Sequence, residues 1–264
     1  MKTIRTVDEL RMELRGATGI GLVPTMGAFH EGHLSLIRAA RAENDVVVVS
    51  LFVNPAQFDE SADLAAYPRD EARDLRLAEA EGVDVVFAPP VDEMYPPGFQ
   101  TWVEVERVSR GLEGAARPGH FRGVATVCLK LFSIVRPDRA YFGQKDAQQA
   151  AVVGQLVHDL ALPLEIRVLP TVREPDRLAL SSRNVRLSPE ERERARALPR
   201  ALDAGADAFA RGADPVAATR EALNGLTPDY VELFDLDGAV VLATAVRVGS
   251  TRLIDNVVLK GDLE

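Results

Sequence analysis

The sequence predicts an α/β protein with a Rossmann-like parallel sheet, helices on both faces of that sheet, and a smaller C-terminal α+β domain. Strand-like and helix-like segments alternate over the first two-thirds of the chain, which is typical of a parallel sheet with right-handed crossovers. Several strand-like segments are apolar throughout, as strands buried on both faces are. The pattern changes after about residue 171, and this change predicts a second domain.

The elements of the first domain follow from apolar spacing and from the glycines and prolines near their ends. Residues 19–23 predict a strand, whereas Leu34, Ile37 and Ala40 recur at helical spacing. Residues 46–53 are apolar and mostly β-branched, so they predict a buried strand. In chain order we expect a strand over 19–23, a helix over 33–43, a strand over 46–53, a helix over 69–81, a strand over 83–87, a helix over 123–135, a strand over 140–142, a helix over 146–160 and a strand over 164–169.

The last third of the chain predicts a smaller α+β domain. Ser188 as N-cap, Pro189 at the first helical position and acidic residues in the first turn predict the start of a long helix. The remaining expected elements are an Ala-rich helix over 201–210, a helix over 215–224, and strands over 230–234, 239–248 and 251–254. We therefore expect two domains, residues 1–171 and residues 172–264, with the polar, irregular segment 173–184 near the boundary.

Composition argues against several classes of function. The chain has 264 residues, of which 47% are hydrophobic and 27% charged, a balance that can form a full core. Its net charge of -9 argues against nucleic acid as the main partner. Its apolar runs are too short to span a membrane, and residues 1–5 lack the apolar stretch of a signal peptide. The single cysteine, Cys128, suits a reducing compartment, so we expect a cytoplasmic protein.

The most informative motif is PTMGAFHEGH, residues 24–33. It joins a predicted strand to a predicted helix, so His30 and His33 lie where unpaired N–H groups and the helix dipole favour an anion. Gly27 and Gly32 lack a Cβ, which lets a ligand approach the backbone closely. We expect a phosphate-binding floor made of two imidazoles and a cluster of N–H donors.

Other chemistries fit this motif less well. A zinc protease places its histidines four residues apart on a helix, whereas His30 and His33 are three apart with Gly32 between them. A Walker loop needs lysine and serine or threonine after its second glycine, where this chain has His33 and Leu34. Two interpretations stay open on this segment: a helix cap with no further role, and a nucleotide site that uses histidines.

Two further polar segments follow predicted strands. Gln57 lies in an uncharged turn after residues 46–53 and has the groups to bind a hydroxy acid, although turn chemistry explains the segment equally well. Lys145 follows residues 140–142 and is placed to meet a phosphate as a point charge. Asp146 either caps the next helix or binds ribose hydroxyls, and Gln149 faces the same side.

A third segment, LALSSRN, follows the last strand of the predicted parallel sheet. Two hydroxyls and the guanidinium of Arg183 suit phosphate oxygens, although an ordinary linker between domains would have a similar composition. Ser181 and Ser182 lack the Gly-x-Ser-x-Gly turn of a serine nucleophile. Because ligands of such sheets bind at the carboxyl ends of the strands, the segments together predict one nucleotide site.

The segments PTMGAFHEGH, VNPAQFD, RPGHFRGVATV, YFGQKDAQQ, LALSSRN and RLIDN closely resemble the AMP-forming pantoate–β-alanine ligase family in order and spacing, and they cover nearly the entire chain. This family is part of the nucleotidylyl-transferase group, which has a Rossmann-like core. The resemblance implies a two-step reaction with ATP and Mg²⁺. The carboxylate of (R)-pantoate attacks the α-phosphorus of ATP to give pantoyl adenylate and pyrophosphate, and the amine of β-alanine then expels AMP to give pantothenate. The resemblance also implies a homodimer.

The resemblance further implies roles for individual residues. Residues 26–33 would bind ATP, with His33 as proton donor and His30 on the phosphates, although an imidazolium of His33 that stabilises the transition state fits equally well. Gln57 and Gln149 would hold pantoate, with Gln57 also near β-alanine. The implied catalytic set is His30, His33, Lys145, Ser181, Ser182 and Arg183. The implied ATP contacts are Met26, Gly27, Ala28, Phe29, His30, Glu31, Gly32, His33, Gly143, Gln144, Lys145, Asp146, Val172, Leu180, Ser181, Ser182 and Arg183.

In this interpretation residues 1–171 bind ATP and pantoate, and residues 172–264 form a lid. One departure is Arg177, where the family commonly has glycine before LALSSRN, so we expect Arg177 to restrict that loop. Two alternatives remain to be weighed. Another nucleotidylyl-transferase acting on a phosphorylated substrate would call for arginines in place of Gln57 and Gln149. A catalytically silent nucleotide-binding protein would be expected to lack one of the histidines or Lys145.

Overall fold

The computed structural model describes residues 1–59, 61–236 and 238–262 and divides into two compact units. The first unit comprises residues 1–142 and 148–169, and the second comprises residues 143–147 and 170–264. Residues 143–147 were predicted to lie in the first domain. In the structure they belong to the second unit, because side-chain hydrogen bonds from Asn256 hold Gln144 and Lys145.

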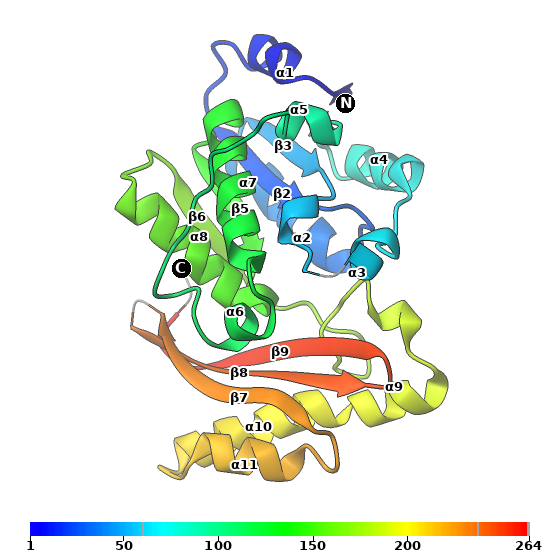
Figure 1. Ribbon diagram of the computed structural model, residues 1–264, viewed down its shortest axis with the longest axis vertical. Helices are drawn as coiled ribbons and strands as arrows, with labels where there is room; N and C mark the ends of the chain where they lie inside the picture. The colour runs from blue at the N-terminus through cyan, green and yellow to red at the C-terminus, as the bar shows by residue number, and fades with distance from the viewer. Residues whose placement is uncertain (60, 237, 263–264) are drawn as a thin grey trace. The chain divides into compact units, whose positions relative to one another are not determined.

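The first unit contains alternating strands and helices (Figure 1). Its short 3-10 helices are named η. Its elements, with those that cross into residues 143–147, are β1 (Lys2–Ile4), α1 (Val7–Glu13), β2 (Ile20–Thr25), α2 (Glu31–Glu43), β3 (Val46–Leu51), η1 (Pro55–Gln57), α3 (Ser61–Ala65), α4 (Glu71–Ala80), β4 (Val85–Phe87), α5 (Val91–Met94), α6 (Leu112–Ala116), α7 (His120–Val135), β5 (Arg139–Gly143), η2 (Gln144–Asp146), α8 (Ala147–Asp159) and β6 (Glu165–Leu169).

The strands of the first unit form a six-stranded sheet in the order β1-β4-β3-β2-β5-β6. The pairings β1–β4, β4–β3, β3–β2 and β2–β5 are parallel, which confirms the predicted fold class. From β2 the chain adds strands outward through β3 and β4, and it then places β5 on the opposite side of β2. The reversal between β2 and β5 is a topological switch point, the usual place for a ligand in an open α/β sheet.

Successive residues of a strand point to opposite sides of a sheet, so each face of this sheet has its own set of apolar side chains. Helices cover both faces. Leu22, Val48 and Phe87 belong to one buried cluster, which is covered by α1, α7 and α8. Val23, Val49 and Val86 belong to a second buried cluster, which is covered by α2 and α4 (Figure 1). Both faces of the sheet are therefore buried, as the mainly apolar strands predicted.

The structure differs from the sequence prediction mainly in short elements. Strand β1 and helix α1 were not predicted, nor were α3, α5 and α6. Each spans too few residues to produce a clear apolar period. The strand predicted over 46–53 ends at Leu51, because Asn54 and Pro55 begin the turn of η1. Helix α2 starts at Glu31 rather than residue 33, because His30 caps it.

The second unit is a three-stranded antiparallel sheet, in the order β7-β8-β9, with helices on one side (Figure 1). Its further elements are η3 (Asn184–Arg186), α9 (Pro189–Ala195), α10 (Ala197–Ala210), α11 (Pro215–Ala222), β7 (Pro228–Leu236), β8 (Ala239–Val248) and β9 (Thr251–Lys260). A third buried cluster joins α10 residues such as Leu202 to Leu242 of β8. Ser188 caps α9 as predicted, and the expected long helix is divided at Arg196.

Candidate functional site

The loop between β2 and α2 turns sharply and is hydrogen-bonded to helix α4. Gly27 has φ of 85° and Ala28 has φ of 54°, both in the left-handed region. The N–H groups of Ala28 and Phe29 each donate to the Asp74 carboxylate, at 2.8 Å. The guanidinium of Arg73 donates to the carbonyl oxygen of Phe29 at 2.8 Å, so two adjacent residues of α4 fix the loop.

Asp74 is almost completely buried, with 1% of its surface exposed. Burial raises the pKa of the Asp74 carboxyl, and the two N–H donors and Arg73 oppose that shift. Gly27 is required beside it, because a Cβ at this position would lie 2.8 Å from a methyl carbon of Leu51 and 3.0 Å from Asp74 Oδ2. The buried carboxyl group of Asp74 therefore sets the backbone conformation of the loop.

These contacts involve part of the predicted phosphate-binding floor. Several of its N–H groups have acceptors within the chain in this structure. Besides Ala28 and Phe29, the donors are Gly27 to Thr25 Oγ1, His30 to His33 Nδ1, Gly32 to His30 Nδ1, and His33 to the carbonyl oxygen of His30. The imidazole groups of His30 and His33 are the other donors of the predicted floor.

The two histidine rings lie close together, tilted by 32°, and each accepts a hydrogen bond at Nδ1. Their ring centroids lie 4.2 Å apart, and Phe29 packs against His33 at 5.6 Å. His30 Nδ1 accepts from the N–H of Gly32 at 3.2 Å, and His33 Nδ1 accepts from the N–H of His30 at 3.4 Å. A neutral imidazole whose Nδ1 accepts a hydrogen bond carries its proton on Nε2. Both rings therefore present Nε2–H as the donor.

Gln57 lies at the end of η1 and is buried, with 8% of its surface exposed. Its Oε1 accepts from Asn54 Nδ2 at 3.1 Å, and its Nε2 lies 3.0 Å from the sulfur of Met26. Asn54 in turn accepts from the hydroxyl of Tyr95 at 2.8 Å. The structure thus brings together Met26 and Gln57, which the sequence predicted to bind different substrates.

The backbone of Gln57 is fixed from the other side by the start of α7. His120 Nδ1 lies 2.8 Å from the carbonyl oxygen of Gln57, and Arg117 donates to the same oxygen at 3.3 Å. Helix α7 approaches η1 closely at Gly123, where a Cβ would lie 2.2 Å from the carbonyl oxygen of Ala56. Only glycine permits this approach, and it gives RPGHFRGVATV a physical role as the support of Gln57.

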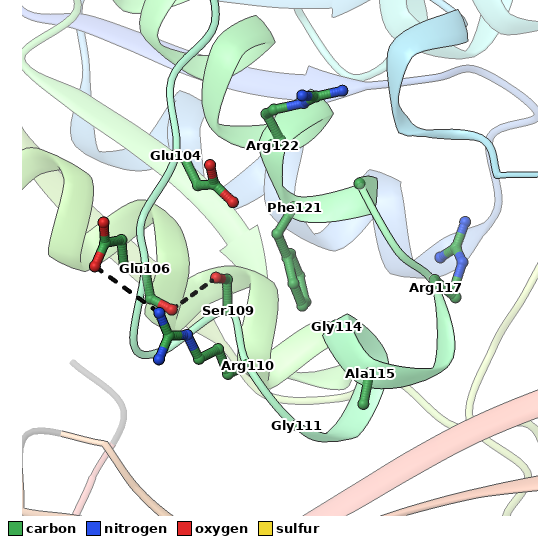
Figure 2. Close-up of a pocket in the computed structure, with 11 residues that line it drawn as sticks. Glu104, Glu106, Ser109, Arg110, Gly111, Gly114, Ala115, Arg117, Phe121 and Arg122 are labelled. Carbon is green, nitrogen blue, oxygen red and sulfur yellow. Dashed lines mark hydrogen bonds and ion pairs between the residues drawn. The ribbon is translucent and has the colours of Figure 1, made fainter.

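A polar cavity of about 520 Å³ lies beside this support (Figure 2). It is lined by the segment that contains Glu104, Glu106 and Arg110 and by residues at the start of α7. Glu106 pairs with Arg110 at 3.9 Å across exposed side chains. None of the predicted site residues lines this cavity among the residues that the structure describes, but Arg117, which contacts Gln57, does.

In the second unit, the segment Gly143–Asp146 is bound to strand β9. Asn256 Nδ2 donates to the carbonyl oxygens of Gln144 and Lys145, both at 2.9 Å. Gln144 Nε2 donates back to Asn256 Oδ1 at 3.2 Å. Lys145 is partly exposed and Asp146 is exposed, whereas the side chain of Gln144 is already engaged. Asp146 does not take the helix N-cap position that one interpretation gave it, because η2 continues directly into α8.

The predicted phosphate segment follows a short hairpin in the same unit. Arg173 and Ala179 form an isolated antiparallel bridge, and Leu180 donates to the carbonyl oxygen of Val172 at 3.0 Å. Ser181 Oγ accepts from the N–H of Arg183 at 3.2 Å. Asn184, which follows Arg183, is buried and binds this segment to the hairpin. Its Nδ2 donates to Glu174 Oε1 at 2.6 Å and to the carbonyl oxygen of Ala179 at 3.1 Å.

Arg177 adopts φ of 73°, the left-handed conformation that glycine adopts freely. The sequence predicted that Arg177 restricts this loop, and in the structure Arg177 is a strained residue at the tip of the hairpin. Its N–H donates to the carbonyl oxygen of Glu174 at 2.8 Å, and its guanidinium pairs with Asp203 of α10 at 2.6 Å. Arg192 of α9 also binds the hairpin, through Glu174 and Asp176.

Sequence reasoning missed several residues that organise these segments. Asn54, His120 and Asn256 lie within motifs that it singled out, so the motifs themselves were the available signal. Asp74 had no such signal, because it lies in an ordinary charged helix far along the chain from the loop that it holds. Gln149 lies on α8 and is partly exposed, while its neighbour Gln148 is buried and binds the carbonyl oxygen of Val108 at 3.0 Å.

No group of three or more histidine, cysteine, aspartate or glutamate side chains among the residues that the structure describes is arranged to hold a metal ion. Within the same residues, no helix is both long enough and apolar enough to cross a membrane.

Comparison with known proteins places this geometry in a family. The family model for pantoate-β-alanine ligase matches residues 1–258. The chain is 55% identical to pantothenate synthetase of Roseiflexus castenholzii over 277 residues, which cover 98% of this chain and 100% of the relative. It is 54% identical to pantothenate synthetase of Moorella thermoacetica over 280 residues, which cover 98% and 99%.

Solved structures agree with the sequence relatives. The chain is similar to a crystal structure of pantothenate synthetase from Thermus thermophilus, with a TM-score of 0.94, 48% identity and coverage of 99% of this chain and 100% of that chain. It is also similar to pantoate-β-alanine ligase from Francisella tularensis complexed with βγ-ATP and β-alanine, with a TM-score of 0.85, 35% identity and full coverage of both chains, 100% each. The chain therefore belongs to the pantoate–β-alanine ligase family, ATP-using enzymes that join pantoate to β-alanine.

Proposed function

We propose that this ligase works in two steps, through a pantoyl adenylate. A carboxylate oxygen of pantoate forms a bond to the α-phosphorus of ATP, and the bond to the bridging oxygen breaks with release of pyrophosphate. The amine of β-alanine then attacks the activated carbonyl carbon, loses a proton, and displaces AMP to leave the amide pantothenate. Both steps depend more on charge neutralisation and alignment than on a nucleophilic side chain.

The geometry of His30 and His33 is the observation that carries this proposal. Both rings accept a main-chain hydrogen bond at Nδ1 within the loop, which holds each imidazole in a fixed orientation with its proton on Nε2. A preorganised donor stabilises charge that develops on the phosphate without reorganisation during the reaction. His33 then acts as the proton donor or, when protonated, as an imidazolium that stabilises the transition state. Residues 26–29 give the loop its shape and contact ATP.

The remaining assignments follow the family motifs. Gln57 binds pantoate and lies near β-alanine, and its buried side-chain amide, which contacts Asn54 and Met26, suits the orientation of a hydroxy acid. Gln149 is the second pantoate ligand. Residues 143–146 bind ATP, with Lys145 on the phosphates and Asp146 at the ribose; Val172 contacts adenine through its backbone; and Leu180, Ser181, Ser182 and Arg183 bind the phosphates. In this proposal the second unit acts as the lid.

Mg²⁺ enters as part of the substrate, MgATP. The described residues offer no cluster of three metal ligands, and Mg²⁺ commonly keeps several waters and binds through substrate phosphates. The Francisella tularensis relative, complexed with βγ-ATP and β-alanine, supports the choice of small-molecule ligands. We further propose that the enzyme is a cytoplasmic homodimer, on the basis of its family and its single buried Cys128.

Family membership and the two glutamines weigh against the alternatives. A transferase for a phosphorylated substrate needs cationic side chains where Gln57 and Gln149 stand. A silent nucleotide-binding protein would not need His30, His33 and Lys145 together, and all three are present.

The decisive experiment is exchange of labelled pyrophosphate into ATP in the presence of pantoate and Mg²⁺ but without β-alanine. We expect exchange, because the adenylation step is complete and reversible before the amine binds. His33→Ala should abolish exchange, whereas His158→Ala, at an exposed histidine of α8, should not change it. Exchange that appeared only after addition of β-alanine would contradict formation of the adenylate before the amine binds, and it would indicate a concerted reaction. No exchange with pantoate under any condition would refute the adenylation step.

A further inference from the structure

We propose that Asn256 is a positioning residue that sets the backbone of Lys145 for phosphate binding. This inference rests on the proposed function, because it requires Lys145 to contact ATP. It assigns a role to the motif RLIDN, residues 252–256, which the family resemblance identified but to which no function was given.

All three hydrogen bonds that the structure gives to the Asn256 side chain go to Gln144 and Lys145. The amide nitrogen donates to the carbonyl oxygens of both residues at 2.9 Å, and the amide oxygen accepts from Gln144 Nε2 at 3.2 Å. The amide nitrogen has two hydrogens, so both are used. The carboxamide therefore binds two successive peptide groups, and a bond to two peptides fixes a backbone segment more strongly than a bond to one.

Burial makes this contact rigid. Asn256 is 2% exposed, so water does not compete for its hydrogen bonds. The contact also has a fixed base, because the neighbouring residue Asp255 is 1% exposed and accepts two hydrogen bonds from Arg173, at 2.6 and 3.0 Å. Asp255 Oδ1 also accepts from the N–H of Asn256 at 2.8 Å. Strand β9 thus presents the Asn256 carboxamide in one orientation.

The consequence for Lys145 follows from its place in η2. Its carbonyl oxygen and that of Gln144 are held, so its Cα has little freedom, while its side chain remains partly exposed. A lysine on a fixed backbone loses less conformational entropy when it binds a phosphate. Residues 143–147 also lie in the second unit because of this contact, so Lys145 belongs to the same unit as Ser181, Ser182 and Arg183.

A double-mutant cycle tests the inference. We compare wild type, Asn256→Ala, Lys145→Ala and the double variant by pantoate-dependent pyrophosphate exchange, with KM for ATP and kcat measured separately. Asn256→Ala should lower exchange roughly tenfold to a hundredfold, since a small misplacement of a catalytic group has effects of that size. In the Lys145→Ala background the same substitution should cost less than about twofold, because the two residues then act through one contact.

Two matched variants separate positioning from general stability. Thr219→Val removes a different buried hydrogen bond of the second unit, 2.7 Å to the carbonyl oxygen of Pro215, and should lower Tm without changing KM for ATP. Asn256→Ser is a milder substitution that retains one hydrogen-bond donor, and it can be measured in place of Asn256→Ala if that variant does not fold. It should show an intermediate loss in exchange.

The outcomes distinguish the two proposals. Wild-type exchange in Lys145→Ala would refute the phosphate role of Lys145 and, with it, the role of Asn256. A large loss in Lys145→Ala, together with wild-type exchange in both folded Asn256 variants, would refute only the positioning role. Equal fold losses from the Asn256 substitution with and without Lys145 would also refute it, because a purely structural effect is independent of Lys145.

Discussion

At the scale of single residues, buried polar side chains shape the segments to which function is assigned. Asp74 accepts from Ala28 and Phe29, and Asn256 donates to the carbonyl oxygens of Gln144 and Lys145. In both cases the buried side chain contacts main-chain atoms of the segment, and Asn256 also accepts from the side chain of Gln144. The sequence identified the residues expected to meet ATP from their local motifs. It could not identify Asp74, because 45 residues separate it from Phe29 and nothing local marks it.

Asp74→Asn should weaken catalysis through the shape of the ATP loop. The amide oxygen of asparagine can replace one carboxylate oxygen, but its NH2 group would face a second N–H donor, which leaves a buried donor unsatisfied at about 1–3 kcal/mol. We expect a loss of roughly tenfold in kcat/KM for ATP. Asp70→Asn is the matched control, because it makes the same change at the exposed cap of α4. Equal kinetics for the two variants would contradict this role.

The pH dependence of stability offers a second readout of the same substitution. Burial raises the pKa of Asp74 above its unfolded value of about 3.9. Between those two pKa values the native state binds more protons than the unfolded state, so the free energy of unfolding falls as pH rises. Asp74→Asn removes this titration. The difference in unfolding free energy, wild type minus variant, should therefore be greatest in acid and decrease toward neutral pH.

At the scale of elements, the long strands and helices were predictable, whereas several short helices and the first strand were not. Strand β8 spans the predicted residues 239–248, and α7 begins at His120 rather than residue 123 but ends as expected at Val135. Short helices such as α6 escaped because they complete too few turns to show a period, whereas the short strand β4 was predicted from its apolar residues. The hairpin over 173–179 escaped for a different reason, since arginine occupies the position where such turns usually place glycine.

Arg177 provides a test of strain in that hairpin. A non-glycine residue in the left-handed region costs about 1–2 kcal/mol. The ion pair with Asp203 joins half-exposed side chains and contributes about 0–1 kcal/mol. Arg177→Gly removes both the strain and the pair, whereas Arg177→Ala removes the pair alone. We expect the glycine variant to be more stable than the alanine variant by about 1 kcal/mol in urea unfolding. An alanine variant as stable as the glycine variant would show that the turn is not strained.

At the scale of the whole molecule, each compact unit has its own core. The clusters that contain Leu22 and Val23 lie in the first unit, and the cluster that contains Leu202 lies in the second. The change of pattern near residue 171 indicated this division. The transfer of residues 143–147 to the second unit could not be foreseen, because it depends on three hydrogen bonds to Asn256, more than a hundred residues away.

Separate cores predict separate responses to core substitutions. Trp102, the chain's single tryptophan, lies in the first unit, so its fluorescence reports unfolding of that unit, while circular dichroism reports both. Leu22→Ala and Leu202→Ala are matched, since the two leucines are 0% and 2% exposed, and each should cost about 2–5 kcal/mol in its own unit. Leu22→Ala should shift the urea midpoint of Trp102 fluorescence. Leu202→Ala should leave that midpoint in place and shift only a part of the dichroism change. If Leu202→Ala moved both signals together, the two units would unfold as one cooperative body, and the independence of their cores would be refuted.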